Sequence, residues 1–206
     1  MVGARRASAD APAVRPQEGR VGENREREIE DAVIENPGAL GFPDATAIRN
    51  VRVAMGFGRI DLMLFPRSGP VKLVLVEAKH TSAPDSISKV IGQLLMYYSG
   101  ALRIGATGFE CFRKFSEAQR ERALSTAWIS PKQLTGGVSP PPAAWAVIQS
   151  GEKLCPEDVR LFVAINAPPH EALRTAVKVL RQHHALDIGL VVVQERRIQL
   201  LSADAV

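Results

Sequence analysis

Two short apolar runs, residues 59–65 and 71–77, are separated by a segment rich in proline and glycine, residues 66–70. Strand-like runs joined by a few such residues are typical of a β-hairpin. A hairpin fixes which side chains of the two runs lie next to one another, so it constrains the rest of the fold. We therefore take these runs as two neighbouring strands of a sheet.

Polar residues occupy one face of this hairpin. Because side chains alternate along a strand, Asp61, Leu75, Glu77 and Lys79 share one face and Ala78 takes the other. With the turn centred near Ser68, Asp61 lies opposite Leu75 and diagonal to Glu77, and diagonal neighbours have Cβ atoms roughly 7 Å apart. Two carboxylates at this spacing can close around one cation.

Asp61, Glu77 and Lys79 suit metal-assisted hydrolysis of a phosphodiester. Mg²⁺, or Mn²⁺ in its place, prefers oxygen ligands and retains several waters, so two carboxylates and the backbone carbonyl of Ala78 suffice as protein ligands. Lys79 would position the attacking water and offset charge in the transition state. The alternative is a polar strand end that forms an ordinary ion pair.

A helix is expected next, after residues 81–85, with Asp85 as its N-cap. Its apolar residues recur at helical spacing: Ile87, Val90, Ile91, Leu94, Leu95 and Tyr98. Gln93 and Tyr97 lie one turn apart at the edge of this stripe and can face the same cleft as Glu77. Taken alone, each is equally a residue that borders the core.

A second helix is expected upstream, over residues 26–35, with Ile29, Val33 and Ile34 facing inward. Asn36-Pro37-Gly38 ends it, because proline disfavours helical backbone at the preceding residue.

These segments together resemble the PD-(D/E)XK nuclease superfamily, and most closely the catalytic domain of NucS-type endonucleases. The resemblance rests on E-x-x-I-x-x-x-V-x-x-N-P, then G-x-I-D, then V-E-A-K, then Q-x-x-x-Y. It implies an α/β fold with a restriction-endonuclease-like core, in which a central mixed β-sheet is flanked by helices. It covers roughly residues 24–101 and 158–193.

The resemblance also implies an active site. By motif position its residues are Glu26, Asp61, Glu77, Lys79 and Gln93. Glu26 matches the first-helix glutamate because it lies three residues before Ile29, although Glu28 and Glu30 stand nearby and helical geometry alone does not decide among them.

The C-terminal part is expected to extend the sheet. Residues 159–165 and 188–193 are strand-like, residues 169–183 are helical in pattern, and residues 197–201 form a short last strand. Strand, helix, strand is the unit that adds parallel strands by a right-handed crossover.

Two features depart from NucS-type enzymes. Only about two dozen residues precede the first helix, where those enzymes carry a β-rich domain, so their substrate preference is not inherited. Residues 102–158 also form a longer connection than expected, with a charged helical run at 115–128 and a loop at 136–142. This insertion is a substrate lid, a partner surface or an edge cover.

The chain's 206 residues, 46% of them hydrophobic, suffice for one domain, expected over residues 23–206. Residues 1–22 lack an apolar period and are expected to be disordered. No stretch is apolar enough for a secretory signal or a membrane span. Cys111 and Cys155 lack a partner motif, which suits a reducing cytoplasm.

The formal net charge of +4 is compatible with binding DNA without requiring it. Arg59, His80, Lys89 and Tyr97 flank the motifs and are candidate nucleic-acid contacts, although each of the first three is equally a solvated surface charge. A homodimer is reasonable for cutting both strands, and no small-molecule cofactor is expected.

The sequence therefore predicts a metal-dependent endodeoxyribonuclease that acts in DNA repair, restriction or defence. One alternative is a catalytically inactive nuclease fold that serves as a nucleic-acid-binding or assembly subunit. Another is an unrelated α/β domain whose acidic residues lie far apart. The separation of the Asp61 and Glu77 carboxylates distinguishes the last from the other two.

Overall fold

The computed structural model describes residues 18–52, 57–80, 86–103 and 153–202. The helical elements are α1 (Glu18–Glu35), η1 (Pro37–Leu40), α2 (Ser86–Arg103), η3 (Pro156–Asp158) and α7 (Glu171–His184). The strands are β1 (Thr46–Arg52), β2 (Arg59–Phe65), β3 (Leu73–Lys79), β4 (Val159–Ile165), β5 (Ile188–Gln194) and β6 (Arg197–Leu200).

The strands form one mixed sheet in the order β1-β2-β3-β4-β5-β6. The first three strands are antiparallel neighbours, β3, β4 and β5 run parallel, and β6 returns antiparallel to β5. Parallel neighbours need a crossover, and α7 provides it between β4 and β5. The expected α/β class and central mixed sheet are confirmed.

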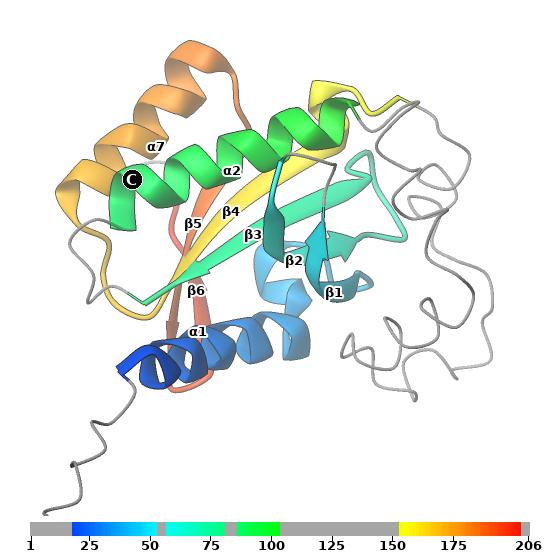
Figure 1. Cartoon of the computed structure of the whole chain (residues 1–206). Helices are drawn as coiled ribbons and strands as arrows, with labels where there is room; N and C mark the ends of the chain where they lie inside the picture. The colour runs from blue at the N-terminus through cyan, green and yellow to red at the C-terminus, as the bar shows by residue number, and fades with distance from the viewer. Residues whose placement is uncertain (1–17, 53–56, 81–85, 104–152, 203–206) are drawn as a thin grey trace, which may run out of the picture.

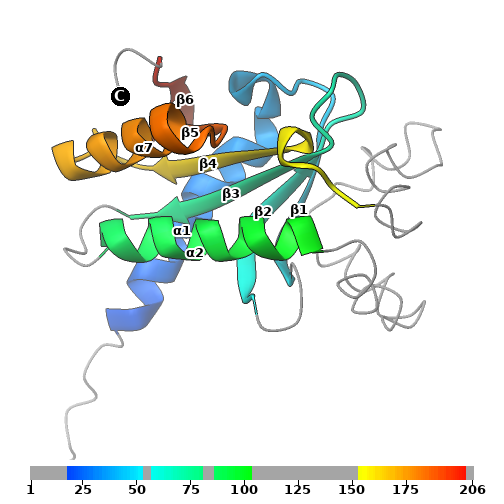
Figure 2. The same ribbon diagram turned by 90° about the horizontal axis from the view of Figure 1, so that it is seen from above.

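Helices cover both faces of the sheet (Figures 1 and 2). On one face, Val90 and Leu94 of α2 and Leu173 and Val177 of α7 join a core cluster with sheet residues. On the other face, α1 and η1 bury a second cluster that includes Ile29 and other residues. The strands are therefore apolar on both faces, as a sheet between two helical layers requires.

The apolar spacing of α1 explains its docking. Ile29 and Val33 are fully buried and Ile34 is partly buried, as expected from the sequence, and the helix ends at Glu35 before Asn36-Pro37. It begins at Glu18, earlier than the expected start at Glu26, so the last residues of the expected 1–22 tail are helical. Residues 1–17 lie outside the described part of the chain.

The hairpin between β2 and β3 is present, but its register differs from the expectation. Met63, and not Asp61, is opposite Leu75, and Leu62 pairs with Val76. Continuing this register places Asp61 opposite Glu77. The shift is an even number of residues, so the residues that pair, from Leu62 to Leu64, keep their expected faces.

Beyond Leu62 and Val76 the two strands separate. β2 stays paired with β1 as far as Arg59, while β3 stays paired with β4 as far as Lys79. Ile60 packs in the cluster beneath α2 and Leu62 in the cluster beneath α1, although alternate residues of a regular strand share a face. The strand β2 therefore turns at Asp61 and leaves a gap beside the end of β3.

The described parts of the expected insertion belong to α2, which ends at Arg103, and to η3 just before β4. Residues 104–152, with the expected helical run and loop, lie outside the described residues, as does the expected N-cap Asp85. The C-terminal strands and helix agree with the sequence pattern within a few residues. No helix in the described ranges is long and apolar enough to cross a membrane.

Candidate functional site

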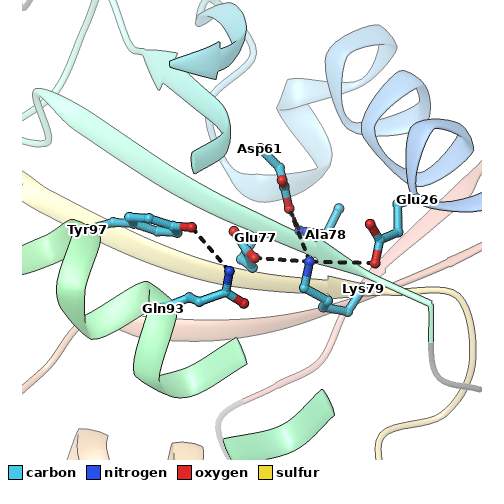
Figure 3. A network of polar contacts seen from close by, with 7 residues as sticks. All are labelled: Glu26, Asp61, Glu77, Ala78, Lys79, Gln93 and Tyr97. Carbon is cyan, nitrogen blue, oxygen red and sulfur yellow. Dashed lines mark hydrogen bonds and ion pairs between the residues drawn. The ribbon is translucent and has the colours of Figure 1, made fainter. Parts of the chain in front are cut away.

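The gap between β2 and β3 is bridged by a side chain in place of a backbone pair. The backbone amide of Ala78 donates a hydrogen bond of 2.8 Å to Oδ2 of Asp61 (Figure 3). The N–H and C=O of one strand residue point toward the same neighbouring strand, so the carbonyl of Ala78 also faces this gap. The end of β3 thus presents a carboxylate and a backbone carbonyl side by side.

The ammonium group of Lys79 lies close to three carboxylates that come from three different elements. Its Nζ lies 3.1 Å from Oε1 of Glu77, 3.5 Å from Oε1 of Glu26 and 3.8 Å from Oδ2 of Asp61. Figure 3 shows the ammonium group at the centre of these acids. Residues 26, 61 and 77 come from α1, β2 and β3, so only the folded chain brings them together.

Glu77 is the most buried of the acids, with 1% of its surface exposed. Its Oε2 is buried and has no hydrogen-bond partner among the described residues. Burial, and after it the charge of the neighbouring Asp61 carboxyl, raise the pKa of Glu77 to about 8 against the opposing charge of Lys79. Buried carboxyl oxygens normally have a hydrogen-bond or charge partner, so this oxygen is available to a ligand with positive charge.

The electrostatics of Asp61 and Lys79 follow from the same crowding. Burial raises the pKa of Asp61 above its ordinary value, while Lys79 and the Ala78 amide act against that rise. Burial lowers the pKa of Lys79, but the carboxylates of Glu77, Asp61 and Glu26 outweigh it and leave the pKa raised. The lysine is therefore a fixed positive charge among acids that cannot all ionise without more cationic charge.

Helix α2 adds an amide and a phenol to the site. Nε2 of Gln93 donates to the hydroxyl of Tyr97 at 3.3 Å, and Oε1 of Gln93 is buried with no partner in the described part of the chain. Burial, with Glu77 and Asp61 nearby, raises the pKa of Tyr97 to about 12. Figure 3 places both side chains beside Glu77.

Gly58, just before β2, allows close packing against Tyr97. The sequence analysis gave this glycine no role. Its φ of +84° is left-handed, and a Cβ there would meet Cε1 of Tyr97 at 3.0 Å. The glycine thus allows the start of β2 to lie directly on the tyrosine ring. The signal in the sequence was the glycine of G-x-I-D itself.

The structure distinguishes among the three glutamates of α1. Glu26 contacts Lys79, whereas Glu28 is exposed and lines a groove on the other side of the helix. Glu30 lies deeper, where Nη1 of Arg49 is 3.3 Å from its Oε2. Burial raises the pKa of Glu30 to about 7 against the opposing charge of Arg49. Sequence reasoning missed Arg49, a buried arginine that docks α1 on β1.

The candidate nucleic-acid contacts are not equally placed. Arg59 and Lys89 are exposed near the site, and His80 is half-buried just after β3. Tyr97 differs from the expectation, because its residue surface is 4% exposed and its ring belongs to the core cluster beneath α2. Its hydroxyl accepts a hydrogen bond from Gln93 within the fold, and its role as a nucleic-acid contact stays a prediction.

The arrangement fits a hard divalent cation that is shared with substrate. Within the described ranges, no three histidine, cysteine, aspartate or glutamate side chains are grouped so as to hold a metal alone. Mg²⁺ needs only one or two carboxylates when water and phosphate oxygens complete its shell. Asp61, Glu77 with its unused oxygen, and the Ala78 carbonyl supply that smaller set.

Comparison of the chain with known protein families, with curated proteins and with solved structures gives no match.

Proposed function

We propose that this chain is a divalent-metal-dependent nuclease that hydrolyses DNA phosphodiester bonds, built on a PD-(D/E)XK type of core with a NucS-like motif order. The observation that carries the proposal is the meeting of Asp61 and Glu77, from two strands, at the ammonium group of Lys79, which lies 3.8 Å from the first carboxylate and 3.1 Å from the second. An unrelated α/β domain has no need to bury two acids against one another at a strand end.

Asp61, Glu77 and the carbonyl of Ala78 would hold Mg²⁺ or Mn²⁺. The bound ion would supply positive charge to a phosphate oxygen and lower the pKa of a water molecule. A second cation would also relieve the repulsion between the two carboxylates, which now raises the pKa of Glu77. The acids are thus arranged for a partner with positive charge.

Lys79 and its neighbours would act on the water and on the phosphate. The ammonium group donates to the attacking water or to a non-bridging phosphate oxygen, which offsets the negative charge that develops during attack. Glu26 holds Lys79 from the helix side at 3.5 Å. The unpartnered Oε1 of Gln93 can accept a hydrogen bond from the same water, because Tyr97 engages the other end of the amide.

The direct test measures Mg²⁺-dependent cleavage of single-stranded, duplex and branched DNA, with RNA of matching sequence as a further substrate. Wild type is compared with Asp61→Asn, Glu77→Gln and Lys79→Ala, and with Lys178→Ala, an exposed lysine on α7, as the matched control. We expect wild type and Lys178→Ala to cleave at the same rate, and the three site variants to lose roughly 100-fold or more.

The same experiment tests the alternatives. Equal rates for wild type and Lys79→Ala would reject the proposed site. Binding of DNA without cleavage by wild type, together with calorimetry that detects no Mn²⁺ binding, would assign the fold to an inactive binding or assembly subunit. Cleavage of RNA alone would keep the site and change the substrate.

A further inference from the structure

A groove of about 1040 Å³ lies between α1 and the tight turn that joins β5 to β6. Arg25 and Glu28 line it from the helix, and Asn166, Arg196 and Arg197 line it from the ends of the strands. Figure 1 shows the β5–β6 turn running beside α1. Its volume reaches the upper end of the range for small-ligand pockets.

The groove is lined by residues that are sequence neighbours of the candidate active site. Arg25 lines the groove, and the next residue, Glu26, contacts Lys79 of the candidate site. Neighbouring residues of α1 therefore belong to the groove and to the site. Lys79 pairs with Ile165, and Asn166 is the next residue of the chain. The groove and the site therefore share the edge of the sheet where the parallel strands β3, β4 and β5 end.

The groove has the chemistry of a surface that binds phosphates. Arg25, Arg196 and Arg197 are all exposed, and the lining residues that the structure describes offer guanidinium and amide donors but no aromatic ring. Arginine forks match phosphate oxygens in geometry and charge. Such a surface contacts the backbone of a nucleic acid and does not read its sequence.

The turn that carries the arginines has an unusual backbone. Glu195 has a φ of 48° and Arg196 a φ of 64°, and they are the two residues between β5 and β6. Two-residue hairpins of this kind favour Asn-Gly, because left-handed backbone disfavours other residues. Here a charged pair occupies the turn at a cost in stability, and the turn projects Arg196 beside Arg197.

An ion pair with Glu35 competes with a phosphate for Arg196. Nη2 of Arg196 lies 3.5 Å from Oε1 of Glu35, but 69% of the arginine side chain and 49% of the glutamate side chain are exposed. Exposed pairs of this kind contribute little, so a phosphate can replace the carboxylate. Glu28 on α1 and Glu195 in the turn are the acidic residues of the groove lining, and both oppose phosphate binding.

We infer that this groove binds the phosphodiester backbone of the DNA strand next to the bond that is cleaved, with Arg25, Arg196 and Arg197 as its phosphate contacts. This inference rests on the proposed function for the position of the cleaved bond. The binding itself stands on the groove alone and can be measured without cleavage.

The test uses the full chain and fluorescence anisotropy of labelled single-stranded and duplex DNA, without divalent metal, over a range of salt concentrations. The variants are Arg25→Gln, Arg196→Gln, Arg197→Gln and their combination. Arg67→Gln is the matched control, because Arg67 is exposed in the β2–β3 turn at the opposite end of the sheet. Circular dichroism confirms that each variant is folded.

We expect the combined variant to bind at least roughly tenfold more weakly and to flatten the dependence of log affinity on log salt by about 0.7 per lost arginine on single strands. Glu28→Gln is expected to bind more tightly than wild type, and Arg67→Gln to match it. In cleavage assays the combined variant raises KM and leaves kcat unchanged.

The outcomes separate this inference from the proposed function. If wild type cleaves DNA and the combined variant keeps the wild-type affinity and salt slope, phosphate binding by the groove is rejected and the proposed nuclease function is retained. If wild type binds DNA without cleaving it and the combined variant loses that binding, phosphate binding by the groove is supported and the proposed nuclease function is rejected. Absence of any binding by wild type overturns the groove.

Discussion

Oδ2 of Asp61 accepts a hydrogen bond of 2.8 Å from the backbone amide of Ala78, at the point where β2 separates from β3. The carboxylate thus takes the place of the backbone partner that a continued ladder would provide. One interaction therefore both closes the exposed strand edge and fixes the acid beside Glu77. The fold and the site depend on the same residue, and substitutions at Asp61 must be chosen to separate the two roles.

Asp61→Asn is expected to keep the fold and to lose the ion. The asparagine Oδ1 can still accept from the Ala78 amide, whereas the negative charge is gone. We expect Mn²⁺ binding, measured by calorimetry, to weaken by more than about tenfold, with a melting temperature near that of wild type. Asp61→Ala removes both roles and should also lower the melting temperature. Wild-type Mn²⁺ affinity in Asp61→Asn would show that this carboxylate is not a ligand.

The raised pKa of Glu77 predicts that the free energy of unfolding falls as the pH rises from about 4.5 to about 8. The folded protein holds the Glu77 proton up to about pH 8, whereas the unfolded chain releases it near 4.5. The stabilisation is therefore complete below pH 4.5 and is lost as the pH rises through 8, at up to about 1.4 kcal/mol per pH unit. Denaturant unfolding at a series of pH values measures this slope.

Glu77→Gln is expected to remove that part of the slope. Glu30 also holds a proton in the folded state, up to about pH 7, so the slope that remains between pH 7 and 8 belongs to Glu77 and the Asp61 carboxyl beside it. There the wild-type free energy of unfolding should fall while that of Glu77→Gln stays nearly level. Glu171→Gln, at an exposed position on α7, is the control and should follow wild type. Parallel curves for Glu77→Gln and wild type would contradict the assigned proton.

Arg49 is expected to contribute to stability out of proportion to a surface ion pair. It is 8% exposed and contacts Glu30 and Asp31, so it docks α1 against β1. Above about pH 7, where Glu30 is ionised, Arg49→Met leaves its buried carboxylate without a counter-charge and should cost about 3 kcal/mol. Arg196→Met, which breaks the exposed pair with Glu35, should cost less than about 0.5 kcal/mol.

A double-mutant cycle tests the cause of that cost. If the unpaired Glu30 carboxylate is responsible, Arg49→Met combined with Glu30→Gln should be more stable than Arg49→Met alone. Denaturant midpoints of the four proteins give the coupling free energy. Strict additivity would mean that Arg49 acts through packing of its hydrocarbon chain and not through charge.

The sequence predicted the parts of the site that follow from strand parity. Asp61, Glu77 and Lys79 were assigned to one face because alternation along a strand does not depend on details of the turn. The register was wrong by two residues, since the connection from Phe65 to Leu73 is longer than the proline and glycine pattern indicates. An even shift keeps the paired residues on their expected faces, but β2 turns at Asp61, so the contact of Asp61 with Lys79 comes from that turn and not from strict alternation.

Features set by tertiary contacts could not be predicted in this way. Glu26, Glu28 and Glu30 alternate along one helix, and only the docking of α1 brings the first of them to Lys79. The separation of β2 from β3 depends on β1, which the sequence analysis did not identify as a strand. Tyr97 was placed at the edge of the apolar stripe, and its burial follows from the close approach of Gly58.

The approach of Gly58 to Tyr97 gives a prediction with an internal control. Gly58 and Gly69 have nearly the same φ, +84° and +85°, so alanine strains the backbone equally at both positions. At Gly69 a Cβ meets nothing within 4 Å, and the cost should be about 1 kcal/mol. At Gly58 the Cβ meets the Tyr97 ring at 3.0 Å, and we expect a further cost of about 1 kcal/mol in denaturant unfolding.

The same pair of variants connects packing to the proposed chemistry. A displaced Tyr97 ring would carry its hydroxyl away from Nε2 of Gln93 and loosen the amide beside Glu77. Gly58→Ala should therefore slow cleavage severalfold under conditions where it is fully folded, while Gly69→Ala should cleave at the wild-type rate. Equal stability and equal rates for the two variants would mean that the ring moves aside without cost, and that Gly58 serves only the turn into β2.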